Sequence, residues 1–356
     1  MTLMHYTSVT GLVITAPHKA SLQEIEVPCV PEFVTVQVHL CGICTPEQRV
    51  FRGAKKTYPY WGGHELCGRV ESDRSSSHSP LAPGTPVAIA LMPRCGHCEA
   101  CRRGLDNHCA YLNPTTTNLP QGPRGFSNCI TVPRYQVFPL PASVDMLTAA
   151  LAEPIACALR SVNRGAIASG ETAVVIGSGT MGLLHVILLM LKGVRVLVFD
   201  NDVAGLEQAR ASGADYVGAL DETLVDVVKD LTNGWGAHAV FCTRGGSTAI
   251  EWAIRIAARN GRVVLFQSVL GSDNVRLSAN DLHYREIQLV GSIAQGANDF
   301  RAAVSILAHH ATRFNSIKRV VFPYIRGEEA LDCALGSEFN RVMIAFSQDA
   351  EKLVSQ

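Results

Sequence analysis

The sequence has no long hydrophobic run and no excess of either charge. Its longest apolar stretch, LLHVILLML at 183–191, is too short to span a bilayer and is typical of a buried helix. Lys plus Arg and Asp plus Glu both number 31, so no strong field would recruit nucleic acid or an anionic membrane. The segment MTLMHYTSVT at 1–10 lacks the basic and apolar regions of a secretory signal. We therefore expect a cytoplasmic protein with no nucleic-acid partner and no membrane partner.

Cysteine, by contrast, is abundant. The chain of 356 residues contains 12 cysteines. Without a secretory signal we expect a reducing compartment, where clustered cysteines bind metal more often than they form disulfides. The length is sufficient for two domains, each with its own hydrophobic core.

The first part of the chain predicts an irregular, mostly β region. Pro and Gly interrupt it throughout, and short runs with strand character lie at 34–40, 66–72, 85–91 and 129–141.

The pattern changes near residue 145, where a helix is predicted over 145–164. Short apolar strands then alternate with helical segments, which is typical of a parallel sheet covered on both faces. These strands are expected at 172–179, 195–200, 215–220, 238–243, 262–268 and 287–293. The carboxyl-terminal part mixes a helix at 300–309 with strand-like runs at 319–325 and 341–346. The sequence thus predicts an α/β protein with a doubly wound parallel sheet and a separate irregular β part.

A nucleotide site is predicted at VVIGSGTMG, residues 174–182, where a strand runs into G-x-G-x-x-G and then into a helix. Gly177 would allow the tight turn, Gly179 would let the backbone approach a pyrophosphate, and Gly182 would let helix and strand pack closely. Thr180 and Met181 complete the loop at the positive helix N-terminus.

Asp200, at the end of the next predicted strand, would accept hydrogen bonds from the ribose hydroxyls and repel a 2′-phosphate. Asn201, Asp202 and Gly205 follow, with no arginine among them to receive that phosphate. The sequence therefore favours NAD over NADP as the cofactor.

A structural metal site is predicted at CGHCEACRRGLDNHC, residues 95–109. Four thiolates close a tetrahedral shell around zinc and leave no open position for chemistry. An iron–sulfur cluster also takes four thiolates, but nothing else in the sequence suggests electron transfer. The four predicted ligands of this zinc are Cys95, Cys98, Cys101 and Cys109.

The order of these motifs resembles the zinc-dependent medium-chain alcohol dehydrogenase family over essentially the whole chain. The motifs are GIC at 42–44, GGHE at 62–65, the four-cysteine lobe, LAEP at 151–154, GSGTMG at 177–182, and Asp200. The sequence is similar in particular to the sorbitol/polyol and threonine dehydrogenase branch, because Glu153 precedes Pro154. The resemblance implies a discontinuous GroES-like catalytic domain at 1–153 and 295–356 and a Rossmann NAD-binding domain at 154–294. It also implies two zinc ions per chain and a homo-oligomer, either a tetramer or a dimer.

The same resemblance assigns a second, catalytic zinc to Cys44 and His64, with Glu65 and Glu153 both candidates for the third ligand. His64 and Glu65 would point to opposite faces of a regular strand, so both reach one metal only if the backbone turns, which Gly62–Gly63 would permit. Three protein ligands leave a position open for a substrate oxygen. Arg341 resembles the basic residue that reaches the cofactor pyrophosphate; the alternative is an exposed charge on a strand.

One departure from the family follows Cys44. The family usually has Ser or Thr, and then Asp, where this chain has Pro46 and Glu47. Pro46 has no hydroxyl to pass on a substrate proton, and Arg49 cannot act as a base at neutral pH. Thr45 or a water beside a glutamate would have to carry the proton. The alternative interpretation of Pro46 is a simple turn residue.

Taken with the resemblance, these residues predict a zinc-dependent enzyme that transfers hydride between NAD(H) and a small-molecule alcohol or ketone. The expected substrate is a secondary alcohol of a polyol, sugar alcohol, cyclitol or amino alcohol. A reductase of an imine, enone or other activated carbonyl is one alternative. A non-catalytic, zinc-stabilised binding protein is the other.

Overall fold

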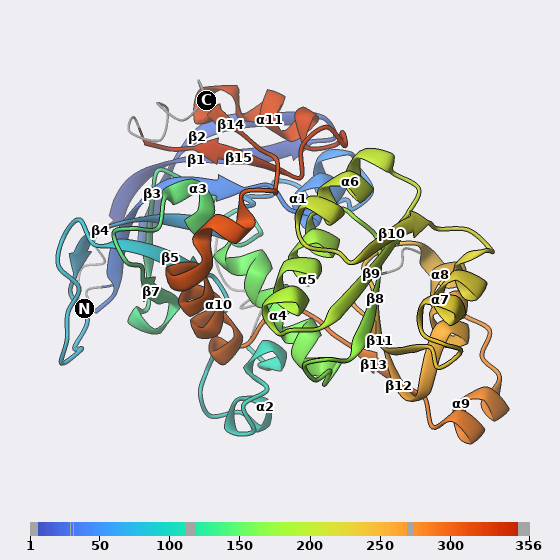
Figure 1. Cartoon of the computed structure of the whole chain (residues 1–356). Coiled ribbons are helices and arrows are strands. Elements are labelled where there is room, and N and C mark those ends of the chain that lie inside the picture. Colours follow the sequence, from blue (N-terminus) through green and yellow to red (C-terminus); the bar gives the residue numbers. More distant parts are fainter. Residues whose placement is uncertain (1–5, 29, 31, 112–118, 269–273, 348–356) are drawn as a thin grey trace. The chain divides into compact units, whose positions relative to one another are not determined.

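The computed structural model describes residues 6–28, 30, 32–111, 119–268 and 274–347. These form two units, coloured along the chain in Figure 1. The first comprises residues 1–153, 296–311 and 318–356, and the second comprises 154–295 and 312–317. This division differs from the expected one at 312–317, which belongs to the second unit, where the Ser212 hydroxyl bonds the Ser316 hydroxyl at 2.8 Å.

The first unit is built on β-sheets. An antiparallel hairpin of β1 (Tyr6–Ala16) and β2 (Lys19–Pro28) lies beside a seven-stranded sheet with the order β14-β15-β3-β4-β5-β7, in which β6 pairs with β3. The strands of this sheet are β3 (Val34–Gly42), β4 (Glu65–Asp73), β5 (Pro86–Ala90), β6 (Cys129–Val132), β7 (Val137–Pro139), β14 (Arg319–Pro323) and β15 (Arg341–Ala345). The strand expected over 129–141 is broken at Pro133, which cannot donate to a ladder. Apolar residues from both sheets form one core with apolar residues from the segments between strands, among them Trp61 and Phe126.

Short helices complete the first unit. They are α1 (Thr45–Phe51), α2 (Glu99–Arg102), α3 (Met146–Ala149), α10 (Ala297–His310) and α11 (Gly327–Cys333), with 3-10 turns at Asp106–His108, Arg134–Gln136 and Tyr324–Arg326. The helix expected over 145–164 is two helices, α3 and α4 (Ala152–Arg164), and α4 runs from the first unit into the second.

The second unit is a six-stranded parallel sheet with the order β10-β9-β8-β11-β12-β13. Its strands are β8 (Thr172–Ile176), β9 (Arg195–Asp200), β10 (Tyr216–Ala219), β11 (Ala237–Cys242), β12 (Ala257–Leu265) and β13 (Gln288–Gly291). The chain moves outward from β8 to β10 and then returns to the other side of β8. The carboxyl ends of β9, β8 and β11 are therefore neighbours at a topological switch point, where ligands bind in such sheets.

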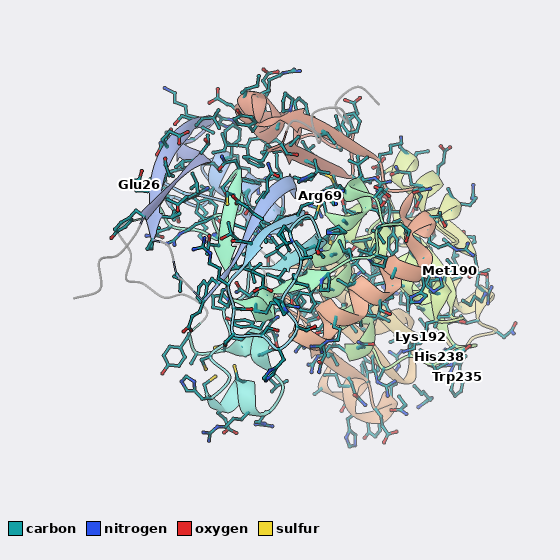
Figure 2. The ribbon with its side chains drawn as sticks, turned by 90° about the vertical axis from the view of Figure 1, so that its left-hand side faces the viewer. Glu26, Arg69, Met190, Lys192, Trp235 and His238 are labelled. Atoms are coloured by element: carbon teal, nitrogen blue, oxygen red, sulfur yellow. The ribbon has the colours of Figure 1, made fainter. Side chains whose placement is uncertain are left out.

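Helices cover both faces of this sheet (Figure 1), with α5 (Thr180–Leu191) and α6 (Val203–Ala211) on one side and α7 (Leu224–Leu231) and α8 (Gly246–Ile256) on the other. α9 (Ala279–Arg285) and a 3-10 turn at Ala311–Phe314 complete the unit. The side chains of Lys192, Trp235 and His238, labelled in Figure 2, mark the end where the parallel strands begin. The glycine loop after β8 lies at the opposite end. Among the described residues, no helix combines the length and the apolar content that a membrane span requires.

Candidate active site and cofactor loop

Pro46 lies in the first turn of a helix. Cys44 is the N-cap of α1 in extended conformation, and Thr45 and Pro46 are its first two helical residues. The first N–H groups of a helix have no partner within it, so a proline there removes no helical hydrogen bond. Pro46 thus belongs to the first turn of a helix and not to a simple turn. It offers no hydroxyl to a substrate, as its residue type requires.

A turn at Gly63 brings His64 and Glu65 to the same site. Gly63 has φ of +91°, and a Cβ there would lie 2.5 Å from the backbone nitrogen of Phe126. A side chain at this position would therefore be both strained and obstructed. β4 begins only at Glu65, so His64 precedes the strand, and the alternation that would separate the two side chains does not apply.

Glu47 is a site residue that sequence reasoning missed. Its side chain is fully buried, and its Oε1 accepts hydrogen bonds from the Gly63 backbone N–H at 3.0 Å and from His64 Nδ1 at 3.1 Å. Its Oε2 accepts from the Cys44 backbone N–H at 3.2 Å. Glu47 thereby fixes the position of both Cys44 and His64, and it leaves His64 Nε2 for another partner. The available signal was its place three residues after an N-cap, the acidic position of a capping box.

The candidate ligands form two groups that share His64. One ligand atom from each of Cys44, Glu47 and His64 lies within 4.8 Å of the others, and the same holds for His64, Glu65 and Glu153. The other three predicted ligands of the catalytic zinc, Cys44, Glu65 and Glu153, therefore lie near His64. Glu153 is in the first turn of α4, so its carboxylate also faces the positive end of a helix.

Glu65 is paired with Arg341. Arg341 Nε lies 3.2 Å from Glu65 Oε2, and its NH1 donates to the Ile43 carbonyl at 2.9 Å. The Arg341 residue is 6% exposed, so the expectation of an exposed strand charge is wrong. Burial alone would lower the pKa of Arg341, but the neighbouring Glu65 carboxylate raises it. Neither carboxylate oxygen of Glu65 has a hydrogen-bond partner among the described residues, although both are buried.

The candidate site is rich in acidic groups. Burial, together with the Glu65 carboxylate, raises the pKa of the Cys44 thiol to about 11. Three carboxylates, those of Glu47, Glu65 and Glu153, lie near His64; Glu47 pairs with His64 itself, and Glu65 pairs with Arg341. A divalent cation with soft and hard ligands satisfies this set, and thiolate, imidazole and carboxylate are the donors that zinc accepts.

The four-cysteine lobe has the geometry of a closed metal site. The ligand atoms of Cys95, Cys98, Cys101 and Cys109 all lie within 4.8 Å of one another, and the Cys95 and Cys101 sulfurs are 4.0 Å apart. Tetrahedral zinc with Zn–S bonds of about 2.3 Å separates its sulfurs by about 3.8 Å.

Backbone N–H groups favour thiolates in this lobe. The N–H groups of Ala110 and Cys101 lower the pKa of Cys98 to about 6. The N–H groups of Cys95 and Tyr111 lie 3.4 and 3.5 Å from the Cys109 sulfur. The four sulfurs thus fit zinc in spacing, and backbone N–H groups favour the thiolate form of Cys98 and Cys109.

An acidic residue attaches the lobe to the rest of the first unit. Asp106 pairs with Arg94 at 2.5 Å and accepts from the Ala297 backbone N–H, at the start of α10, at 3.0 Å. The side chains of Arg94 and Asp106 are 7% and 14% exposed, so solvent screens this pair only weakly.

The glycine loop after β8 fits a dinucleotide. Gly177 has φ of +109°, and a Cβ on Gly182 would lie 1.9 Å from the Gly177 carbonyl oxygen. Gly179 is the N-cap of α5, and a Cβ there would meet no atom within 4 Å. The loop is therefore tightly packed on its inner side and open at the helix N-terminus that includes Thr180 and Met181, where a pyrophosphate would be held.

Asp200 ends β9 beside this loop, but its carboxylate is already bonded within the protein. Asp200 Oδ2 accepts from the Ser178 backbone N–H at 2.6 Å and from the Ser178 hydroxyl at 2.8 Å. Oδ1 accepts from the Asn201 N–H at 2.7 Å and from Arg244 NH1 at 3.0 Å. Burial opposes the charge of Asp200, but these donors lower its pKa. No arginine follows Asp200 closely in the sequence, but Arg244, from the loop after β11, contacts its carboxylate in the fold. The sequence argument against an arginine at this position was therefore incomplete.

Known proteins with similar sequences are dehydrogenases. Two families match: "Alcohol dehydrogenase GroES-like domain" over residues 30–142 and "Zinc-binding dehydrogenase" over residues 180–309. A 2-dehydro-3-deoxy-L-galactonate 5-dehydrogenase of Pseudoalteromonas atlantica is 29% identical, covering 77% of this chain and 80% of that one. An erythritol/L-threitol dehydrogenase of Mycolicibacterium smegmatis is 27% identical, covering 94% and 96%.

Solved structures of the same fold agree with these matches. A zinc-binding dehydrogenase from Sinorhizobium meliloti bound to NADP superposes with a TM-score of 0.83 at 25% identity, covering 95% of this chain and 99% of that one. L-idonate 5-dehydrogenase from Escherichia coli gives 0.85 at 24% identity, covering 96% and 99%. With its GroES-like catalytic part, its Rossmann sheet and its two groups of metal-ligand residues, this chain belongs to the zinc-type medium-chain alcohol dehydrogenase family of oxidoreductases.

Proposed function

We propose that this protein is a zinc- and NAD(P)-dependent dehydrogenase of a secondary alcohol in a polyol, sugar alcohol or sugar acid. The observation that carries the proposal is that His64 belongs to two groups of candidate ligands in the first unit, one with Cys44 and Glu47 and one with Glu65 and Glu153. Similar proteins named erythritol/L-threitol dehydrogenase and sorbitol dehydrogenase support the substrate class. A zinc ion bound there would polarise the substrate oxygen, and the nicotinamide would accept the hydride.

We assign Cys44, His64 and Glu153 as the three ligands. A Cys44 thiolate and the Glu153 carboxylate balance the charge of a divalent zinc. Glu65 is already balanced by Arg341 at 3.2 Å. His64 would hold the zinc through Nε2, because its Nδ1 lies 3.1 Å from Glu47, and such a partner would orient the imidazole toward a metal. The cysteine lobe would hold a second, structural zinc, as the mutual proximity of its four sulfurs supports.

Because position 46 offers no hydroxyl, another group must accept the proton that leaves the substrate alcohol. Glu153 is partly exposed, whereas Glu65 is fully buried and tied to Arg341. We therefore assign the proton to the second carboxylate oxygen of Glu153.

We also propose that the protein is a homo-oligomer. Within the described residues, β13 is an edge strand of the six-stranded sheet and has one side unpaired, and an unpaired edge can pair with a second copy of the chain.

The test is nicotinamide absorbance at 340 nm with zinc-loaded protein and a panel of erythritol, sorbitol, D-arabinitol and simple secondary alcohols. We expect reduction of NAD or NADP by a polyol, and its loss in Cys44→Ser with the fold retained. In Glu153→Gln we expect the loss of one zinc per chain, whereas Glu65→Gln retains both. Turnover that persists in Cys44→Ser would contradict the proposal. Activity only toward imines or enones would replace the substrate class.

A further inference from the structure

We propose that Arg244 is the residue that reads the ribose 2′ position of the cofactor, and that it makes the protein accept a 2′-phosphate. This inference rests on the proposed function only in requiring a dinucleotide at the glycine loop. It concerns residues of the second unit alone: the loop after β8, the end of β9, and the loop after β11.

The carboxylate that would exclude a 2′-phosphate is not available to a ribose. A carboxylate offers about four lone-pair sites. In Asp200 these sites face the N–H and hydroxyl of Ser178, the N–H of Asn201, and Arg244 NH1, which lies 3.0 Å from Oδ1 and 3.3 Å from Oδ2. Asp200 is 1% exposed. A ribose diol would have to displace an existing donor to reach it.

Arg244, in contrast, is open to solvent and is placed by the glycine loop itself. Its side chain is 56% exposed. A Cβ on Gly177 would lie 2.7 Å from Arg244 Cγ and 3.1 Å from Cδ, so the aliphatic stem runs across the first glycine of the cofactor motif. Of its five N–H groups, only those on NH1 are bonded to a described residue, and Asp200 is that residue. The remaining donors form the planar fork that suits phosphate.

The local charge balance follows from this arrangement. The pair of Asp200 and Arg244 is neutral, so the repulsion that normally rejects NADP is cancelled at short range. Asp202 carries one further carboxylate near the pair, and its Oδ1 is engaged as the N-cap of α6 by the Ala204 N–H at 3.1 Å. Asp221 carries another, and its Oδ1 accepts from the N–H and the hydroxyl of Thr223. Arg244 therefore meets a 2′-phosphate with a charge-assisted bond, while the NAD ribose loses little, because it never depended on a free Asp200.

The test separates the adenosine end of the cofactor from catalysis. Binding of 5′-AMP and of 2′,5′-ADP is measured by isothermal titration calorimetry on the full, zinc-loaded chain. We expect the wild-type protein to bind 2′,5′-ADP at least as tightly as 5′-AMP. In Arg244→Gln we expect 2′,5′-ADP to bind about 10- to 100-fold more weakly, the effect of one charge-assisted bond, with 5′-AMP changed less than about 3-fold.

Two further variants control the experiment. Arg244→Lys keeps the charge but lacks the planar fork, so its affinity for 2′,5′-ADP should lie between those of the wild type and Arg244→Gln. Arg210→Gln removes an exposed arginine near the other end of α6, about 10 Å along the helix, and should change neither ligand. A wild-type preference for 5′-AMP of more than about 10-fold, or an equal loss of both ligands in Arg244→Gln, would overturn the role of Arg244. If neither ligand binds the wild type, the cofactor site of the proposed function fails as well.

Discussion

Substitution of Glu47 by Gln tests whether this buried carboxylate orients the catalytic metal ligands. Glu47 accepts three hydrogen bonds, from Gly63, His64 and Cys44, at 3.0 to 3.2 Å. The amide of Gln has one oxygen. If that oxygen keeps the bonds to Gly63 and His64, its NH₂ group faces the Cys44 N–H, and two donors meet. We therefore expect His64 or Cys44 to lose its fixed position.

The magnitude follows from comparable metal sites. Loss of a partner that orients a metal ligand lowers metal affinity about 10- to 100-fold, which corresponds to about 1.4 to 2.7 kcal/mol. Within the described part of the chain, the hydrogen bonds of the Glu47 carboxylate go to Cys44, Gly63 and His64, none of which belongs to the cysteine lobe, so the structural zinc should be unaffected. The protein is titrated with a chelator, and the zinc that remains bound is measured by metal analysis. Glu47→Gln should therefore release one zinc per chain at a free chelator concentration about 10- to 100-fold lower than the wild type requires.

The control is Glu71→Gln, which neutralises a carboxylate of β4 in the same unit; its recorded partner is the Cys129 thiol at 3.7 Å. This variant should release zinc as the wild type does. If Glu47→Gln released both zinc ions with wild-type affinity while remaining folded by circular dichroism, the reasoning about Glu47 would be refuted.

Three further predictions concern the lobe, a buried ion pair and a buried histidine. In the lobe, Cys98→Ser should lose one zinc per chain and make 95–111 sensitive to protease, with the second zinc retained; protection equal to wild type would refute this. At the ion pair, Glu65→Gln leaves Arg341 buried without its paired carboxylate and should lower the free energy of unfolding by about 3 to 5 kcal/mol. Adding Arg341→Met to the Glu65→Gln chain should recover most of that loss. Urea unfolding of the two single variants and the double variant measures this coupling. For His185, which is fully buried, desolvation lowers the pKa to about 4. The unfolded chain takes up the proton below about pH 6.5, so stability falls as pH drops from about 6.5 to 4 and the loss at pH 5 is about 2 kcal/mol. His185→Leu should remove that part of the pH dependence in urea unfolding at pH 7 and pH 5, and an unchanged dependence would contradict the assignment.

The parallel sheet could be predicted because its signals are local. Each buried strand is a short apolar run, and each is followed by a helical pattern, so β8 to β13 were all expected near their observed positions. The hairpin of β1 and β2 was not expected, since β2 is half exposed along most of its length and its pattern is mainly polar. The short helix α11 was missed for a related reason, since its seven residues give too few turns for a periodic signal.

The four cysteines of the lobe could be proposed as ligands from their own spacing, whereas the candidate ligands near His64 could be proposed only through the order of motifs. The residues that orient this second group could not be predicted. Glu47 begins a helix whose N-cap is a cysteine, and Pro46 conceals that start because prolines more often signal a turn. Arg244 lies 44 residues after Asp200 along the chain. Their contact depends on β9 and β11 being placed on either side of β8, and strand order is a property of the tertiary fold.

The substitution of a family hydroxyl by Pro46 is compatible with the site because the first turn of α1 places consecutive residues in different surroundings. Thr45 and Pro46 are exposed, whereas Glu47 is fully buried and holds both Cys44 and His64. A residue at position 46 therefore contributes little to the positions of Cys44 and His64. The longer side chain of Glu47, in place of the usual Asp, still reaches Gly63, His64 and Cys44 at hydrogen-bonding distance. The positions of Cys44 and His64 thus depend on Glu47, and the proposed proton acceptor is Glu153 of α4, so neither role requires a hydroxyl at position 46.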